Sequence, residues 1–308
     1  RVQERNVVDA VAEVRIEIAN PLATFAPLTE LPARLDNLPL ASMPAAAERA
    51  SLPPLIPAEG PRRARIALLT GCVQSVVFGT HNRATARVLA KNGCDVVVPE
   101  SQGCCGALNA HGGDHTRALE MARRTIATFE AARVDAVIVN TSGCGAHMKA
   151  YGRLLAEDAA WAARAARFAA SVQDVCEFLA KAPLRGPLAP VPMTCTYHDP
   201  CHVVHGQKIQ QEPRRLLAQI PGLQVIELAE SDWCCGSAGL YNLTEPEMAT
   251  RLLQRKVGHV LATGAEAVVT ANPGCILQIE AGLRARGSTA RVLHIVEIFD
   301  RAYTGARA

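Results

Sequence analysis

Aromatic side chains, long apolar runs and an excess of charge of one sign are scarce in this sequence. Only 4% of the 308 residues are aromatic and the formal net charge is +3, which argues against a nucleic-acid-binding surface. No run of about 18 apolar residues occurs, no apolar signal segment opens the chain, and no G-x-G-x-x-G or P-loop motif is present. We therefore expect a cytoplasmic globular protein without a transmembrane segment; a peripheral position at the inner face of the membrane stays open.

Cysteine, in contrast, is abundant, with 11 residues. A chain of this length can bury enough surface to fold without covalent cross-links. The odd number excludes a fully paired disulfide framework, and reduced thiols in a cytosolic protein indicate metal or redox chemistry. No C-x2-C pair, the usual element of zinc sites, occurs anywhere.

From about residue 64 the sequence repeats itself. The first copy reads ARIALLTGC, CDVVVPESQGCCG and VDAVIVNTSGC, and the second reads MTCTYHDPC, LQVIELAESDWCCG and AEAVVTANPGC. SVQDVCEFL near residue 171 also matches RVLHIVEIF near residue 291. Four cysteine pairs keep offsets of 129, 130, 130 and 131 residues: Cys72 and Cys201, Cys104 and Cys234, Cys105 and Cys235, Cys144 and Cys275. We predict two tandem domains over residues 64–182 and 192–308, joined by a linker at 183–191.

Residues 1–63 differ in composition from the two copies. Apolar residues between Val7 and Ile18 have a helical spacing, and nine of the 19 prolines fall between Pro21 and Pro61. This part of the chain is predicted to be a helix followed by a Pro-rich linker or wrapping arm.

Within each copy, short β-branched runs alternate with longer helical stretches. The runs Ile66 to Leu69, Val96 to Val98 and Ala136 to Val139 predict three strands of the first copy. Thr244 is predicted to be the N-cap of a helix that ends before Gly264. Alternating strands and helices predict an α/β fold of two pseudo-symmetric domains, each a small parallel sheet flanked by helices.

The repeated cysteines each follow a predicted strand. Because the carboxyl ends of parallel strands meet at one edge of a sheet, the four cysteines of each copy are expected to converge there. Gly106 and Gly236 are expected to free the backbone after each Cys-Cys pair, to let it wrap a bulky cofactor.

Four converging thiols could hold an iron-sulfur cluster, bind zinc, form disulfides or fill a core. Separated loops and an adjacent Cys-Cys pair suit the larger body of a 4Fe-4S cluster better than a single zinc ion. Cys94, Cys176 and Cys195 have no repeated counterpart and are predicted to be core residues.

Several polar residues lie near these cysteines in the sequence. His147 could be a further ligand, could donate a hydrogen bond to a cluster sulfur, or could be a surface or capping residue. His198, His202 and His205 occur only in the second copy, where they could form a proton relay or an exposed polar loop. His198 and His202 could also be extra metal ligands or could contact the ligands. Asn140 and Asn272, at the third strand ends, are interpreted as structural.

The spacings C-x31-CCG-x37-C and C-x32-CCG-x38-C resemble tandem cysteine-rich "CCG" domains. The segments GCCGALNAH, SGCGAHMKAYGRLL, CCGSAGLYNLTEPEMA and VVTANPGC look like those of the iron-sulfur subunit of bacterial glycolate oxidase. Lactate-utilisation proteins and the B subunit of heterodisulfide reductase are related. The resemblance covers residues 64 to 305. It implies an electron-transfer subunit that passes electrons from an FAD-binding flavoprotein, oxidising a 2-hydroxy acid, toward a quinone acceptor.

Two features depart from this resemblance. The N-terminal C-x2-C-x2-C-x3-C-P runs of glycolate oxidase subunits are absent, and the chain starts with Arg; either a leading segment is missing or a ferredoxin-like subunit supplies that relay. The heterodisulfide reductase relatives end each motif in C-x2-C, where this chain has His147 and Gln278. With four thiolates in each site, ordinary cubane 4Fe-4S clusters are favoured over the noncubane clusters of those relatives. A zinc-stabilised scaffold that docks flavoproteins and a reductase acting directly on quinone remain the alternatives.

Overall fold

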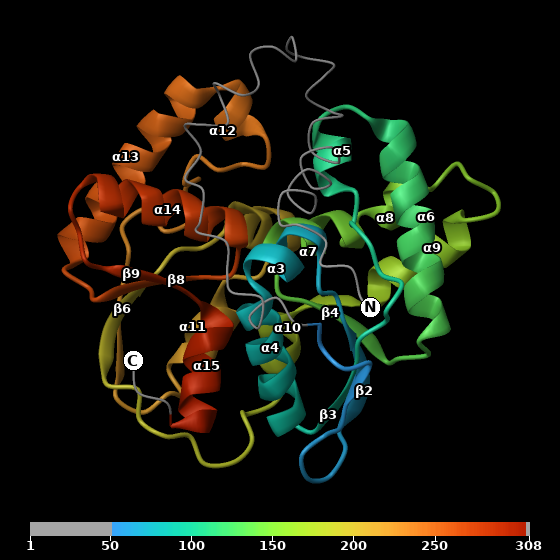
Figure 1. The fold of residues 1–308 in the computed structure, drawn as a ribbon, viewed down its shortest axis with the longest axis horizontal. Helices are drawn as coiled ribbons and strands as arrows, with labels where there is room; N and C mark the ends of the chain where they lie inside the picture. The colour runs from blue at the N-terminus through green and yellow to red at the C-terminus, as the bar shows by residue number, and fades with distance from the viewer. Residues whose placement is uncertain (1–50, 306–308) are drawn as a thin grey trace, which may run out of the picture.

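The computed structural model describes residues 51–305, and the helix predicted over Val7 to Ile18 lies outside them. Figure 1 shows two lobes, each a sheet with helices on both sides. The first domain contains β1 (Leu55–Ile56), β2 (Ala64–Leu68), α3 (Cys72–Val77), α4 (Gly79–Lys91), β3 (Cys94–Val97), α5 (Ala107–His111), α6 (His115–Ala131), β4 (Ala136–Val139), α7 (Ser142–Lys149), α8 (Tyr151–Leu154), α9 (Ala162–Ser171), β5 (Val172–Asp174) and α10 (Val175–Leu179). The second contains β6 (Met193–Tyr197), the short π-helical turn η2 (His202–Gly206), α11 (Gln211–Leu217), β7 (Leu223–Ile226), α12 (Tyr241–Thr244), α13 (Pro246–Thr263), β8 (Ala267–Thr270), α14 (Pro273–Ala285), β9 (Arg291–His294) and α15 (Ile295–Thr304).

The strand order confirms the predicted α/β fold with duplicated parallel sheets. The first sheet runs β1-β3-β2-β4-β5 and the second runs β7-β6-β8-β9. All pairs are parallel except β1 with β3. The strands predicted from residues 66, 96 and 136 are present, the first two beginning two residues earlier than predicted. β5 and β9 are the matched segments near residues 171 and 291.

The described part of the Pro-rich segment lies along the edge of the first sheet. Leu55 and Ile56 of β1 pair with Val97 and Val96, and Val98 donates its N–H to the carbonyl of Pro54 at 2.9 Å. Prolines flank this short strand, which is typical of an edge strand because proline cannot donate to a neighbouring strand.

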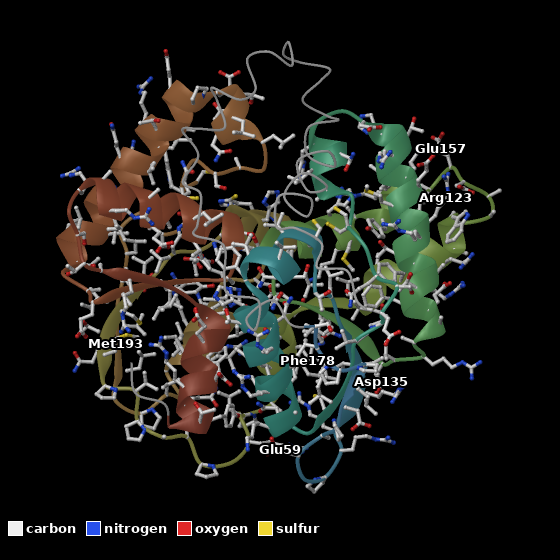
Figure 2. The ribbon with its side chains drawn as sticks, viewed as in Figure 1. Glu59, Arg123, Asp135, Glu157, Phe178 and Met193 are labelled. Atoms are coloured by element: carbon white, nitrogen blue, oxygen red, sulfur yellow. The ribbon has the colours of Figure 1, made fainter. Side chains whose placement is uncertain are left out.

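One apolar core is shared by the two domains, and each domain has a further apolar cluster of its own. α15 of the second domain packs against α4 of the first, and α10 of the first packs against α11 of the second. Since α10 corresponds to α15 and α4 to α11, these two contacts are equivalent and are related by a pseudo-two-fold axis. Buried side chains of both domains, among them Leu89, Phe178, Leu217 and Phe299, belong to this core. Figure 2 shows Phe178 near the middle of the molecule.

The three unrepeated cysteines lie in this core as predicted. Cys94 and Cys195 have no exposed surface and Cys176 is 1% exposed. Burial in apolar surroundings raises the pKa of Cys94 and of Cys195 to about 11, which keeps both thiols neutral.

The predicted start of α13 is wrong and its end is confirmed. The N-cap is Glu245, without a side-chain hydrogen bond, and Thr244 ends the preceding α12. Pro246 is the first helical residue, and because proline disfavours helical geometry in the residue before it, the boundary falls at Glu245. Gly264 ends the helix with φ of 64°.

Candidate metal centres

The structure brings the four repeated cysteines of the first domain together at the carboxyl edge of its sheet. Cys72 begins α3, Cys144 lies in the first turn of α7, and Cys104 and Cys105 lie in the loop between β3 and α5. The Sγ atoms of Cys72 and Cys104 are 3.5 Å apart. Cys105 is in hydrogen-bonding contact with Cys104 on one side and Cys144 on the other, so the four thiols form a row.

The second domain repeats this arrangement. Cys201 precedes η2, Cys275 lies in the first turn of α14, and Cys234 and Cys235 lie in the loop after β7. Cys234 contacts Cys201 and Cys235, and Cys235 contacts Cys275. The expected convergence of all eight repeated cysteines is therefore seen in both domains.

One thiol in the first row and two in the second have a strongly lowered pKa, the third being Cys275, whose pKa is lowered mainly by its hydrogen bond with Cys235. Hydrogen bonds from Cys105 and Cys72 lower the pKa of Cys104 to about 3, and those from Cys201 and Cys235 lower the pKa of Cys234 to about 2. The N–H of Gly106 lies 3.4 Å from the Sγ of Cys104, and the N–H of Gly236 lies 3.3 Å from the Sγ of Cys234. Sulfur is thus ready to act as an anionic ligand in both domains.

The two glycines adopt the left-handed backbone that the sequence indicates, and each also allows a close helix contact. Gly106 has φ of 83° and Gly236 has φ of 91°. A Cβ atom at Gly236 would lie 2.3 Å from the carbonyl oxygen of Ala249 in α13, and one at Gly106 would lie 3.2 Å from the Cβ of Met121 in α6. The missing side chain makes room for α6 in the first domain and for α13 in the second, each of which packs directly on the cysteine loop.

The two asparagines at the third strand ends differ in their contacts. Asn140 is buried and donates to Asn82 at 3.0 Å and to Thr85 at 2.8 Å, a structural position as predicted. Asn272 donates its side-chain N–H to the Sγ of Cys275 at 3.3 Å. Asn272 is the N-cap residue of α14, which is consistent with the predicted structural position, and its amide also contacts a candidate ligand.

The predicted histidine cluster of the second copy separates in the structure. Nδ1 of His202 lies 3.9 Å from the Sγ of Cys201, and Nε2 of His205 lies 3.2 Å from the carbonyl of Asp232. His198 is fully buried, with Nδ1 3.1 Å from the carbonyl of Ser231. One of its ring nitrogens lies within 4.8 Å of the sulfurs of Cys235 and Cys275. The three side chains thus have three different partners.

A second group of histidines lies between the two cysteine sites. His147 is largely buried, its Nε2 has no hydrogen-bond partner, and burial lowers its pKa to about 4. The ring of His111 lies 6.4 Å from that of His147 and 5.7 Å from that of His202. His111 is not among the residues predicted from the sequence, where its only signal is its place in the GCCGALNAH segment.

The donor set of each site suits a soft metal centre. Thiolates select iron-sulfur clusters or zinc, and backbone and amide N–H groups pointing at cluster sulfurs tune a centre's reduction potential. The N–H donors of Gly106, Gly236 and Asn272 are arranged in this way. The residues present therefore fit an iron-sulfur cluster as well as a zinc ion.

Sequence comparison identifies the family. The profile of the cysteine-rich (CCG) domain matches residues 66–149 and again residues 195–280, which together make up more than half of the chain. The chain belongs to the CCG cysteine-rich domain family. Both CCG domains contain one four-cysteine row, and the predicted resemblance to this family is confirmed.

Named relatives of the chain include iron-sulfur subunits and lactate-utilisation proteins. The chain is 39% identical over 85% of its length to a probable glycolate oxidase iron-sulfur subunit of Bacillus subtilis, covering 60% of that protein. It is 30% identical over 76% of its length to lactate utilization protein A of Shouchella clausii, covering 98% of that protein. The chain therefore spans about three fifths of the glycolate oxidase relative and nearly all of the lactate-utilisation relative.

Among solved structures, a hypothetical protein from Helicobacter pylori has a similar fold. The TM-score is 0.59 at 12% identity, with 95% of this chain and 58% of that chain covered. This likeness concerns the fold alone. Within residues 51–305, no helix has the length and apolar character needed to cross a membrane.

Proposed function

We propose that this chain is an iron-sulfur electron-transfer subunit of a glycolate oxidase type complex. Each CCG domain would hold a 4Fe-4S cluster, one on Cys72, Cys104, Cys105 and Cys144 and the other on Cys201, Cys234, Cys235 and Cys275. Electrons would come from an FAD-binding flavoprotein subunit that oxidises a 2-hydroxy acid and would leave toward a quinone-type acceptor. A ferredoxin-like segment or subunit would complete the relay.

The observation that carries this proposal is the duplication of the row of four thiols at equivalent sheet edges. Packing alone does not account for it, because the three cysteines of the shared core are not duplicated, while the eight at the sheet edges are. The similarity to a glycolate oxidase iron-sulfur subunit supports the choice of complex.

The cluster would supply the one-electron chemistry when bound, and the chain would set its conditions. Cys105 is 3% exposed and Cys235 is 1% exposed, so the walls of both sites exclude water from these sulfurs. Tyr151 donates its hydroxyl to the carbonyl of Cys105 at 2.5 Å and so holds the first cysteine loop in place.

Anaerobic purification followed by iron and acid-labile sulfide analysis tests the proposal. Two 4Fe-4S clusters require about eight iron atoms and about eight sulfides per chain. Cys105→Ala should remove about half of both, because the first site has only four thiols. Electron paramagnetic resonance of the reduced protein should then show one cluster in place of two.

Cys94→Ala is the matched control, because Cys94 belongs to the same domain but lies in the apolar core. It should retain the full iron and sulfide content. Equal losses in the two variants, or a colourless protein with stoichiometric zinc after anaerobic reconstitution with iron and sulfide, would contradict the proposal.

A zinc-stabilised scaffold is the second candidate, and one distance favours it. The 3.5 Å between the sulfurs of Cys72 and Cys104 is close to the separation of two thiolates on one tetrahedral zinc ion. The metal analysis above decides between the two candidates. The reductase hypothesis built on His198, His202 and His205 has less support, because these side chains do not form a common site.

A further inference from the structure

His198 distinguishes the second site from the first. It lies at the end of β6, three residues before Cys201, and has no exposed surface. The equivalent residue three before Cys72 is Leu69, a 1% exposed member of the first domain's apolar core. A buried imidazole has therefore replaced a leucine beside one of two otherwise equivalent cysteine rows.

The hydrogen bond of His198 determines which ring nitrogen is free. Nδ1 lies 3.1 Å from the carbonyl oxygen of Ser231, and since a carbonyl only accepts, Nδ1 carries the proton. Nε2 is therefore the ring nitrogen that this loop leaves open, and this buried atom has no hydrogen-bond partner. A buried polar atom without a partner is costly, so its surroundings call for an explanation.

The sulfurs of the second site supply that explanation. A ring nitrogen of His198 and the Sγ atoms of Cys235 and Cys275 all lie within 4.8 Å of one another, all three residues being buried. Across residues 51–305 this is the only group of three such donors that is this compact. A carbonyl on one ring nitrogen with the other nitrogen free is the usual arrangement of a metal-ligating histidine.

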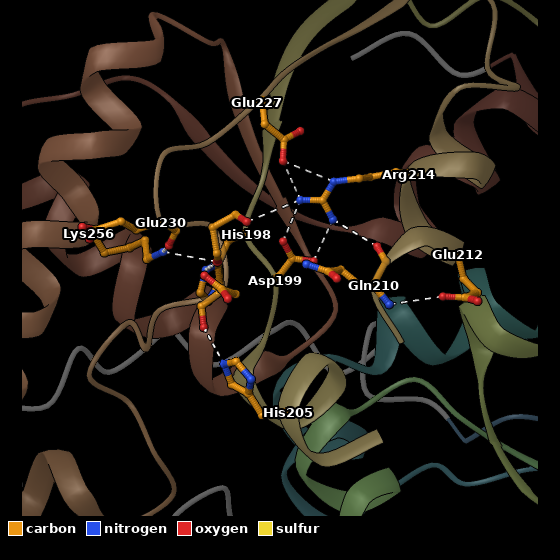
Figure 3. Close-up of polar contacts among 11 residues, drawn as sticks. His198, Asp199, His205, Gln210, Glu212, Arg214, Glu227, Glu230 and Lys256 are labelled. Carbon is orange, nitrogen blue, oxygen red and sulfur yellow. Dashed lines mark hydrogen bonds and ion pairs between the residues drawn. The ribbon is translucent and has the colours of Figure 1, made fainter. Parts of the chain in front are cut away.

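The loop that orients His198 is itself held by charged residues (Figure 3). The carbonyl of Ser231 also accepts from the N–H of Asp199 at 3.1 Å and from the Nζ of the buried Lys256 at 3.3 Å. The side chain of Asp199 in turn binds Arg214 through two hydrogen bonds of 2.9 and 2.7 Å. The imidazole is therefore preorganised before any metal binds.

We propose that Nε2 of His198 is a metal ligand of the second site, beside the sulfurs of Cys235 and Cys275. The second centre is then a mixed imidazole and thiolate centre, whereas the first is ligated by thiolates alone. This inference rests on the proposed function only in taking the metal to belong to an iron-sulfur cluster. The second site has five donors, so one of its thiols is dispensable for cluster binding.

The two centres should consequently differ in reduction potential. A neutral imidazole in place of a thiolate raises the potential of an iron-sulfur centre. The ammonium of Lys256 lies within electrostatic reach of Cys235 and Cys275 and acts in the same direction. Electrons should therefore rest preferentially on the second centre.

Pulsed electron paramagnetic resonance of the anaerobically reconstituted, reduced full chain tests the assignment. The wild type should show a nitrogen strongly coupled to the cluster spin, and growth with 15N-histidine should change that coupling. His198→Gln should lose the coupling and lower the potential of one centre only. His202→Gln is the matched control, since its ring contacts Cys201 without the same burial, and it should keep the coupling.

The outcomes separate this inference from the proposed function. Two clusters without a coupled histidine nitrogen, or a coupling that survives His198→Gln, would overturn the inference and leave the function standing. A chain that binds zinc and no iron would overturn the proposed function. The ligand assignment would then be tested by replacing zinc with cobalt, and it would hold only if His198→Gln changed the visible spectrum of the cobalt-bound protein. If His198→Gln fails to fold, the same nitrogen coupling is measured in His147→Gln and His202→Gln. Both variants should keep the coupling, and its loss in either one would contradict the inference.

Discussion

Single residues set the shape of the cysteine loops. Gly236 combines a left-handed backbone with a close approach to the carbonyl of Ala249 in α13. Any side chain here would both strain the backbone and push α13 away from the loop that contains Cys234 and Cys235. The same logic applies to Gly106, where the contact with Met121 is looser.

Gly236→Ala should accordingly destabilise the protein by about 1–3 kcal/mol, the usual range for a strained backbone residue. Gly258→Ala is the matched control, because Gly258 is exposed within α13 and a Cβ there meets nothing within 4 Å. That variant should gain about 0.5–1 kcal/mol through helix propensity. Urea unfolding measures both; a Gly236→Ala protein as stable as Gly258→Ala would contradict the argument.

At the scale of elements, the last helix of each domain is started by the same device. Asp174 caps α10 with Glu177, and His294 caps α15 with Glu297, each pair forming a reciprocal capping box. Nδ1 of His294 accepts from the N–H of Val296, while Nε2 lies 2.8 Å from the carbonyl of Asn140 in the first domain. The neutral imidazole thus both caps a helix and joins the two domains.

This double contact predicts a pH dependence of stability. Burial, helped by the neighbouring His81, lowers the pKa of His294 to about 3, against about 6.5 in an unfolded chain. Well above pH 6.5 the His294 imidazole is neutral in both the folded and the unfolded chain, so it does not change the free energy of unfolding there. As the pH falls, only the unfolded chain takes up the proton, so stability is lost progressively down to about pH 3. Between pH 7 and pH 5 the loss should be about 2 kcal/mol.

Urea unfolding of the wild type and of His294→Gln at several pH values measures this contribution. The variant lacks the titrating group, so its stability should fall less steeply between pH 7 and pH 5, by about 2 kcal/mol in total. Parallel curves for the two proteins would show that His294 does not titrate as argued.

At the scale of the whole molecule, the two domains share one core. α4, α10, α11 and α15 pack across the pseudo-two-fold axis, and Arg87 forms an ion pair with Asp300 at 2.6 Å across the same boundary. Neither domain can lose its share of this core without exposing the apolar face of the other. The protein should therefore unfold as one cooperative unit.

The two tryptophans make this testable, because Trp161 belongs to the first domain and Trp233 to the second. Trp233→Phe and Trp161→Phe each leave one fluorescent reporter, and their denaturation midpoints should coincide. Adding Phe299→Ala, which empties a fully buried site in the shared core, should lower the free energy of unfolding by about 3–5 kcal/mol. Both midpoints should then move together to a lower denaturant concentration. Separate midpoints, or a shift of the Trp233 signal alone, would mean that the domains unfold independently.

Much of this architecture follows from local patterns. The strands could be predicted because β-branched runs depend only on neighbours in the chain, and the two sheet edges with four cysteines each could be predicted because constant offsets reveal a duplication. Helix α13 shows the limit. The hydroxyl of Thr244 looked like a cap, but Pro246 moved the boundary by one residue through a steric effect on Glu245.

The sequence by itself determined that the protein is a duplication and that its 11 cysteines divide into eight that repeat and three that pack. Only the tertiary structure decided which polar side chains reach the sulfurs. His198, His202 and His205 lie within eight residues of one another, yet only the first is buried against Cys235 and Cys275. His111 comes close to His202 from the other domain. Spacing along the chain specifies where a strand ends, whereas the direction of a side chain beyond that end depends on how loops and domains pack in space.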